Sequence, residues 1–263
     1  MQNPMSELDL GVIRLAFEAG QVIMDIYGAT IEVATKADQS PVTQADQKAE
    51  DVILAGLKTL CPDIPVLAEE SVAKGHVPEI GTKFFLVDPL DGTKEFISRN
   101  GEFTVNIALI ENGLPVFGVV YAPALDDMYF GRKGHGAMHV KMKTSEAWAS
   151  LDRATSITTR PLPPDGATVL ASRSHCDAET EAFIAKTKVA KLVSAGSSLK
   201  FCKVAAGEAD IYPRFGRTME WDTGAGHAVL LAAGGKVLTT DGHPLSYGKR
   251  SRGFDNPAFI ASA

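Results

Sequence analysis

Two carboxylates stand close together in the segment LVDPLDGTKEF, which covers residues 86–96. Asp88 and Asp91 lie three residues apart around Pro89, and they close the apolar run KFFLVD, which is typical of a buried strand. Asp, Pro and Gly are common turn residues, so a plain turn is one interpretation. Carboxylates beside a core are costly unless a cation or hydrogen-bond donors hold them. The alternative is a metal site, and it depends on where the other acids lie.

Four further acids occur where helices or strands are expected to begin or end. Asp46 lies in the first turn of an expected helix, Glu69 and Glu70 end the PVLA segment, and Asp222 starts another helix. Each has an ordinary interpretation, as a capping-box partner of Thr43, a solvated strand edge or a helix-start acid. Mg²⁺ prefers oxygen ligands, and a site for two or three ions needs carboxylates from several elements. Together with DPLDGT, these acids favour the metal site.

The order of residues around the two aspartates suits metal-assisted chemistry. Asp88 ends its strand and can bridge two ions, while Pro89 can leave the Leu90 carbonyl free as a neutral ligand. Gly92 and Thr93 are expected to open a helix whose N–H groups suit a phosphate. Phosphatases that form an aspartyl-phosphate use D-x-D-x-T, with the acids two apart. The spacing here is three, which argues against a covalent aspartate.

The composition sets limits on the partners. The chain has 263 residues, is 45% hydrophobic and 22% charged, and carries a formal net charge of −6. These values are typical of a soluble globular protein and argue against a nucleic-acid polymer as partner. Three cysteines without a C-x-x-C pair argue against a disulfide framework and a zinc site. Without a membrane-length apolar run or a secretory signal, we expect a cytoplasmic protein, with peripheral contact at the inner face of the cell membrane as an alternative.

The periodicity predicts a mixed α/β chain with a change of rhythm near residue 150. Helices are expected over 6–27 and 43–60, and hairpins over 103–123 and 128–140, the first turning at Asn112-Gly113. Later segments alternate as strands (167–172, 191–196, 209–214, 236–240, 257–262) and helices (177–188, 197–207, 223–235). We therefore expect an α+β subdomain over 1–145 with most metal ligands. An α/β subdomain over 146–263 would supply Asp222 and substrate contacts, and the two would form one catalytic unit.

Four motifs resemble those of the inositol monophosphatase superfamily. They are V-T-Q-A-D-Q-K-A-E (42–50), A-E-E-S (68–71), V-D-P-L-D-G-T (87–93) and W-D-T-G-A-G (221–226). They occur in the family's order, and the likeness spans nearly the whole chain. The resemblance implies an α+β fold, the layered αβαβα sandwich of the sugar phosphatases.

Finer features are similar to the 3'(2'),5'-bisphosphate nucleotidase branch of that superfamily. They are the stretches 91–113, SAGSSLKF (194–201) and YPRFGRTMEWD (212–222), with Lys94-Glu95 where inositol-type enzymes often have Thr-Asn. Three departures from the commonest pattern touch no expected ligand and concern the substrate rather than the chemistry: Ala68, Arg217 and Gly224.

The resemblance also implies a set of metal ligands. Glu69, Asp88 and the Leu90 carbonyl would hold one Mg²⁺, and Asp88, Asp91 and Asp222 would hold a second. Glu69 would help to hold a third, weaker ion. Two ions together would activate a water and stabilise the departing oxygen.

Catalytic and substrate roles follow from the same resemblance. Asp46 and Thr93, with Glu69, would orient and deprotonate the attacking water, and Glu70 would support the ligands from behind. The expected substrate contacts are Glu69, Asp91, Gly92, Thr93, Lys94, Ser197, Ser198, Lys200, Arg214 and Asp222. Lys200 has an equal alternative as an exposed helix residue, whereas Arg214 at a strand end is the better anion contact. His175 is expected as a surface or substrate-rim residue rather than as a base.

The implied reaction is Mg²⁺-dependent hydrolysis of a phosphomonoester. The substrate would be adenosine 3',5'-bisphosphate, and the products would be AMP and phosphate. PAPS is a further candidate substrate. The resemblance also implies a link to sulfate assimilation and inhibition by Li⁺. An inositol or sugar phosphatase on the same scaffold is the first alternative. A catalytically inactive, phosphatase-like binding protein is the second. The sequence does not predict an oligomeric state.

Overall fold

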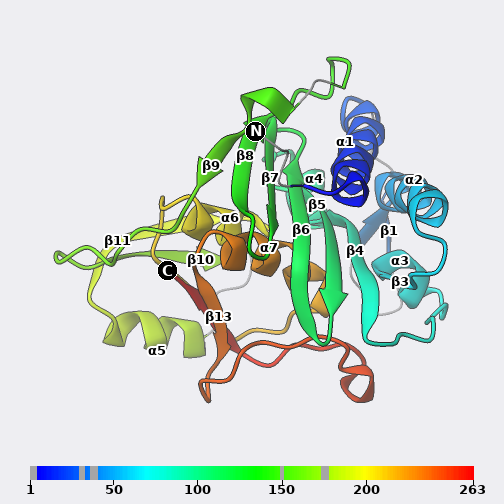
Figure 1. The fold of residues 1–263 in the computed structure, drawn as a ribbon. Coiled ribbons are helices and arrows are strands. Elements are labelled where there is room, and N and C mark those ends of the chain that lie inside the picture. Colours follow the sequence, from blue (N-terminus) through cyan, green and yellow to red (C-terminus); the bar gives the residue numbers. More distant parts are fainter. Residues whose placement is uncertain (1–4, 30–32, 36–40, 149–150, 173–177) are drawn as a thin grey trace.

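Two β-sheets alternate with layers of helices (Figure 1). The structure is a computed structural model, and it describes residues 5–29, 33–35, 41–148, 151–172 and 178–263. The larger sheet has seven strands and the smaller one has five, and a separate two-stranded ribbon precedes them in the chain. All the elements that carry the acids of interest pack on the larger sheet.

The seven-stranded sheet follows the chain from β3 to β9 in order, and only the β3–β4 pair is parallel. Its strands are β3 (Val66–Ala68), β4 (Lys83–Asp91), β5 (Thr104–Glu111), β6 (Leu114–Ala122), β7 (Asp127–Arg132), β8 (Gly136–Lys141) and β9 (Thr155–Ile157). Both predicted hairpins are confirmed. At the β5–β6 turn Asn112 and Gly113 have φ values of 52° and 76°, the left-handed conformation that a tight hairpin turn requires.

The end of β4 is irregular where the two aspartates lie. Asp88 pairs with Asn106 and Asp91 pairs with Thr104, so three steps on β4 oppose two on β5. Such a bulge bends a strand and redirects its side chains. Gly92 then takes φ 93°, which glycine adopts without strain, and the chain enters the short helix α4 (Thr93–Ile97). The predicted helix start at Gly92-Thr93 is confirmed.

The five-stranded sheet has the order β11-β10-β12-β14-β13, with the parallel pairs on one side and the antiparallel pairs on the other. Its strands are β10 (Ala167–Ser172), β11 (Val189–Ala195), β12 (Ile211–Arg214), β13 (Lys236–Thr239) and β14 (Phe259–Ser262). The remaining short elements are β1 (Val33–Thr35), β2 (Pro41–Thr43), α3 (Glu69–Ala73), η1 (Leu151–Arg153) and η2 (Arg250–Arg252). The strands expected in the second half of the chain are thereby confirmed.

Helices cover both sheets and fill the space between them. The long helices α1 (Glu7–Tyr27) and α2 (Gln44–Leu60) lie together on one face of the larger sheet, as Figure 1 shows. Between the sheets lie α6 (Leu199–Ala205) and α7 (Glu220–Ala232), and α5 (Ala178–Lys186) lies outside the smaller sheet. None of the described helices combines the length and apolar character that crossing a membrane requires.

The layers enclose two hydrophobic cores, one on each face of the larger sheet. Along β5, Val105 and Ile107 face α1 and α2, while Ala108 and Ile110 face α7 and the smaller sheet. A strand buried on both faces reads as a nearly continuous apolar run, as β5 does. The order of layers is therefore αβαβα, which confirms the predicted fold class.

The predicted division near residue 145 stays a prediction. Strand β9, which begins at Thr155, pairs with β8 and completes the larger sheet. Helix α7 also comes from the second half of the chain and packs against β4, β5, β6 and β7. Residues from both halves therefore build the same layers.

Glycines let α7 approach the larger sheet closely. A Cβ atom at Gly118 would lie 2.5 Å from the Ala225 carbonyl oxygen and 2.7 Å from the Ala228 Cβ. A Cβ at Gly131 would lie 2.7 Å from the Ala232 Cβ. Real Cβ contacts are longer than this, so the lack of a side chain at Gly118 on β6 and at Gly131 on β7 allows α7 to lie this close to the sheet.

We expect Gly118→Ala to lower the free energy of unfolding by about 1–3 kcal/mol, because the added methyl group displaces α7 from the sheet. Urea titration monitored by circular dichroism measures this change. Gly81→Ala is the matched control, since a Cβ there meets nothing within 4 Å. Equal stability of the two variants would contradict the close-packing interpretation.

Candidate metal and phosphate site

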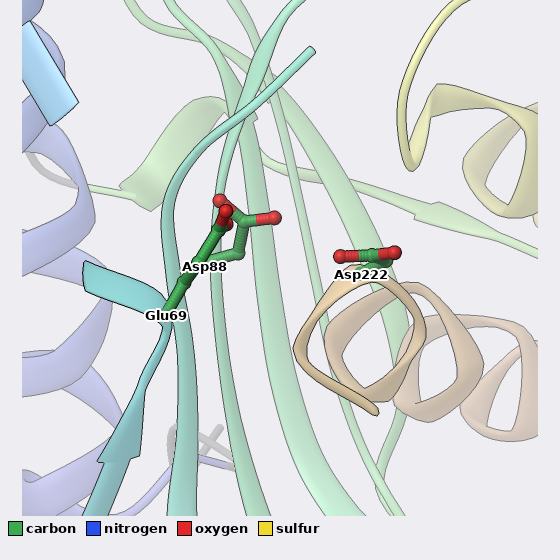
Figure 2. A group of neighbouring side chains, drawn as sticks. All are labelled: Glu69, Asp88 and Asp222. Carbon is green, nitrogen blue, oxygen red and sulfur yellow. The ribbon is translucent and has the colours of Figure 1, made fainter. Parts of the chain in front are cut away.

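Three carboxylates from separate elements converge at one end of the larger sheet. Glu69 is the first residue of α3, Asp88 lies near the end of β4, and Asp222 lies in the first turn of α7. Each offers an oxygen within 4.8 Å of an oxygen of the other two. Figure 2 shows the Asp222 carboxylate facing those of Glu69 and Asp88. The structure thus brings together acids that are 153 positions apart in the sequence at the extremes.

The bulge of β4 orients the groups around Asp88. The Leu90 N–H donates to Asp88 Oδ1 at 3.1 Å across the turn at Pro89. The Leu90 side chain is buried in the core that faces α1 and α2. Asp88 is buried at 1% exposure, and its role as a ligand shared by two ions stays a prediction.

Asp91 is held from two sides. Ser197 Oγ donates to Asp91 Oδ2 at 2.8 Å, and Asn106 Nδ2 approaches the same oxygen at 3.4 Å. Asp91 is also close enough to Asp222 to affect its ionisation. Asn106 also donates to Ser198 Oγ, which donates to the Asp222 carbonyl, so hydrogen bonds connect Asp91 with the start of α7.

The electrostatics of this site are those of crowded like charges. Burial holds the pKa of Asp222 well above its usual range, and the neighbouring carboxylates of Asp91 and Glu69 raise it further. The Met219 N–H, 2.8 Å from Asp222 Oδ2, and the Arg214 charge act in the opposite direction. A divalent cation among the carboxylates removes this repulsion, and oxygen donors are the ligands that Mg²⁺ prefers. The donor set present therefore fits Mg²⁺.

Asp46 both caps helix α2 and accepts a hydrogen bond from Thr93. Its Oδ2 accepts hydrogen bonds from the N–H and the hydroxyl of Thr43, at 2.8 and 2.7 Å, which completes the predicted capping box of α2. Its Oδ1 accepts the hydroxyl of Thr93, at 3.1 Å, from the start of α4. The carboxylate is only 1% exposed. Because the Thr93 proton points at Asp46, the lone pairs of that hydroxyl are turned toward other donors.

Glu69 and Glu70 differ from the predicted strand end. Both lie in α3, and Glu70 is buried at 3% exposure, so the solvated-edge interpretation is wrong for it. The Glu70 N–H donates to Glu50 at 2.8 Å. The start of α3 directly after β3 brings a carboxylate oxygen of Glu69 within 4.8 Å of one of Asp88.

The two serines expected to contact substrate also hold the site together. Ser198 Oγ donates to the backbone carbonyl of Asp222 at 2.7 Å, and Ser197, at φ 51°, lies 2.5 Å from the Thr104 hydroxyl. The SAGSS loop thereby connects β5 with the start of α7. Any substrate contact by these serines is additional to this structural role.

The basic residues near the site have different surroundings. Lys200 is 4% exposed, which makes the exposed-helix interpretation wrong, and its ammonium donates to the carbonyls of Ala195 and Ser197 at 3.2 and 2.6 Å. Burial lowers its pKa to about 8, although Asp91 opposes that shift. Arg214 lies at the end of β12 as expected and donates to backbone carbonyls at 3.0 and 3.1 Å. Lys94 is exposed beside the site, whereas His175 lies outside the described residues.

Several supporting residues were missed by the sequence analysis. Asn106 Nδ2 donates to Ser198 Oγ at 3.0 Å, Thr104 reaches Ser197, and Glu102 accepts the Gly196 N–H at 2.8 Å. Two of the residues involved, Asn106 and Thr104, interrupt the otherwise apolar pattern of β5 with buried polar side chains, which is the one signal that pointed to them.

Comparisons with known proteins agree with this geometry. A model of the inositol monophosphatase family matches residues 4–260. The 3'(2'),5'-bisphosphate nucleotidase CysQ of Escherichia coli K12 is 48% identical over 254 residues, which cover 95% of this chain and 98% of that protein.

Solved structures show the same fold. CysQ from Bacteroides thetaiotaomicron, a bacterial member of the inositol monophosphatase family, has a TM-score of 0.82 and 40% identity. The superposition covers 97% of this chain and 96% of that one. An inositol monophosphatase of Thermotoga maritima has a TM-score of 0.77 and 26% identity, covering 98% and 92%. The chain belongs to the inositol monophosphatase family.

Proposed function

We propose that the protein is a Mg²⁺-dependent phosphomonoesterase that removes the 3'-phosphate of adenosine 3',5'-bisphosphate. The observation that carries the proposal is the convergence of Glu69, Asp88 and Asp222 beside the Asp46–Thr93 pair. A cluster of acids alone would only suggest a cation. The adjacent hydroxyl–carboxylate pair adds the means to orient and deprotonate a water.

Two to three Mg²⁺ ions are proposed for this site. Glu69, Asp88 and the Leu90 carbonyl are the proposed ligands of one ion. Asp88, Asp91 and Asp222 are those of a second, and Glu69 would assist a third. When bound, Mg²⁺ supplies Lewis-acid stabilisation of the charge on the phosphoryl group and the leaving oxygen.

The remaining steps fall to groups of the chain itself. Thr93 Oγ1 accepts a hydrogen bond from the attacking water, because its own proton is directed at Asp46. Asp46 takes up the proton through this hydroxyl, acting as the general base. The backbone N–H groups of Gly92 and Thr93, at the start of α4, would donate to the phosphate oxygens as negative charge develops. Glu70 supports Glu69 from behind.

The nucleotide substrate is supported by the relatives. The Escherichia coli protein that is 48% identical to this chain carries the name 3'(2'),5'-bisphosphate nucleotidase. The proposed contacts for the rest of the substrate are Lys94, Ser197, Ser198, Lys200 and Arg214. Lys200 donates to the carbonyls of Ala195 and Ser197. We therefore propose that it favours an anion through its positive charge and by fixing the position of this loop. PAPS as a second substrate, sulfate assimilation and Li⁺ sensitivity are extensions of the same proposal.

An inositol or sugar phosphatase is the second candidate, supported by the fold shared with the Thermotoga maritima enzyme. An inactive binding protein is less well supported, because the complete carboxylate set beside Asp46 and Thr93 has no evident use in binding alone.

A substrate panel tests the proposal directly. We expect phosphate release from adenosine 3',5'-bisphosphate to exceed release from inositol 1-phosphate, and EDTA to abolish both until Mg²⁺ is restored. A colorimetric phosphate assay measures both rates. Preference for the inositol ester would favour the second candidate, and turnover that survives the chelator would exclude the proposed metal chemistry.

The metal ligands are tested at Asp88. We expect Asp88→Asn to lower kcat/KM by roughly 10²–10³-fold, since the loss of a few kcal/mol of transition-state stabilisation costs a factor of ten per 1.36 kcal/mol. Circular dichroism should show an unchanged fold. Asp63→Asn, at an exposed loop position, is the control for loss of one carboxylate. An active Asp88→Asn enzyme would remove Asp88 from the mechanism.

The water-activating pair is tested at Thr93 and Asp46. We expect Thr93→Val to lower kcat by about 10² or more, with little change in stability. Asp46→Ala should lower kcat similarly and also cost about 1–3 kcal/mol of unfolding free energy, because it leaves the Thr43 N–H without its acceptor. Thr59→Val, exposed on α2, is the matched control. Normal turnover by Thr93→Val would refute the assigned role.

A further inference from the structure

Glu50 is a buried carboxylate on α2, one helical turn after Asp46. It is 3% exposed and accepts two hydrogen bonds, from the Glu70 N–H at 2.8 Å and from the Ser71 hydroxyl at 2.6 Å. Both donors lie in the first turn of α3, whose first residue is Glu69. The mechanism above gives Glu50 no task, although burying a carboxylate is costly.

The start of α3 depends on these two bonds. Ala68, which precedes the helix, has no side chain that could cap it. Glu50 supplies an acceptor from another helix, and its second oxygen secures the Ser71 side chain. On the other side, Ala68 is paired with Val87 in the β3–β4 ladder. Glu69 is therefore placed between a sheet contact before it and the Glu50 contact directly after it.

Helix α2 meets the proposed site at two points. Asp46 reaches Thr93 on the side of the attacking water, and Glu50 reaches α3 on the side of the metal ligand Glu69. Residues four apart lie on the same face of a helix, so a single rigid element connects the two. A shift of α3 relative to α2 would separate Glu69 from Asp88.

We propose that Glu50 is a positioning residue that aims Glu69 at the metal site. The inference rests on the proposed metal chemistry and adds to it a residue that touches neither metal nor substrate. Two properties of Glu50 could matter here: the length of its side chain, called its reach, and its negative charge. Glu50 acts by the span of its side chain and its two acceptor contacts, not by adding negative charge near a cation.

Two conservative variants separate reach from charge. Glu50→Asp keeps the charge but is one methylene too short to hold both donors. Glu50→Gln loses the charge but keeps an oxygen for the Glu70 N–H and an amide that can donate to the Ser71 hydroxyl. We expect Glu50→Asp to weaken metal binding about tenfold and Glu50→Gln to stay within about twofold of the unchanged protein.

The probe is Mn²⁺, which suits the same oxygen ligands as Mg²⁺, with free Mn²⁺ measured by electron paramagnetic resonance. The Mg²⁺ concentration for half-maximal turnover should rise by the same factor in Glu50→Asp. Asp51→Asn, an exposed acid one residue further along α2, is the control for general charge effects and should bind Mn²⁺ normally. Unfolding measured without metal reports any purely structural loss.

Three outcomes would overturn the inference: normal Mn²⁺ affinity in Glu50→Asp, affinity in Glu50→Gln as weak as in Glu50→Asp, or equal weakening by Asp51→Asn. The first excludes positioning, the second shows that Glu50 needs its charge as well as its reach, and the third shows that acids of α2 affect metal binding without contacting α3. Failure of the proposed function is recognised separately, because the unchanged protein would then bind no Mn²⁺ and show no Mg²⁺-dependent turnover.

Discussion

The mutual repulsion of carboxylates is the constraint on which this site depends. Burial and the neighbouring carboxylates of Asp91 and Glu69 raise the pKa of Asp222, and the fold nevertheless holds these groups together. The surrounding structure must therefore be rigid enough to hold these carboxylates in place. Backbone donors, the serines of the SAGSS loop and the close packing of α7 on the larger sheet provide that rigidity.

The layered architecture explains why the acids can meet at all. Glu69 directly follows β3, and Asp88 lies near the end of the neighbouring parallel strand β4, so both lie at the same edge of the sheet. Asp222 arrives from the opposite layer, at the start of the helix that lies between the two sheets. Asp46 comes from the helical layer on the other face. The site thus lies where three layers reach one end of the molecule, and no single layer contains it.

Sequence patterns predicted those features that are coded locally. The capping box at Thr43 and Asp46, the turn at Asn112-Gly113 and the buried strand before Asp88 each depend on neighbours within a few residues. The family motifs predicted the ligand set, of which Glu69, Asp88 and Asp222 converge in the structure. Long-range pairings were missed, including Glu50 with Glu70 and the placement of β14 between β12 and β13. The burial of Lys200 was missed for the same reason, since carbonyls of the preceding loop decide it. Such contacts follow from tertiary packing, and helical or strand periodicity does not predict them.

The bulge in β4 carries a consequence for how this enzyme can vary over evolution. Between Asp88 and Asp91 the strand uses three steps against two on its neighbour, and a strand reverses its faces with each single step. Exchanging Leu90 for another residue keeps its backbone carbonyl in place and alters the fit of one buried side chain. Losing or gaining a residue there would turn one aspartate toward the opposite hydrophobic core. Substitutions at Leu90 are therefore expected to be tolerated during evolution, whereas insertions and deletions between Asp88 and Asp91 are not.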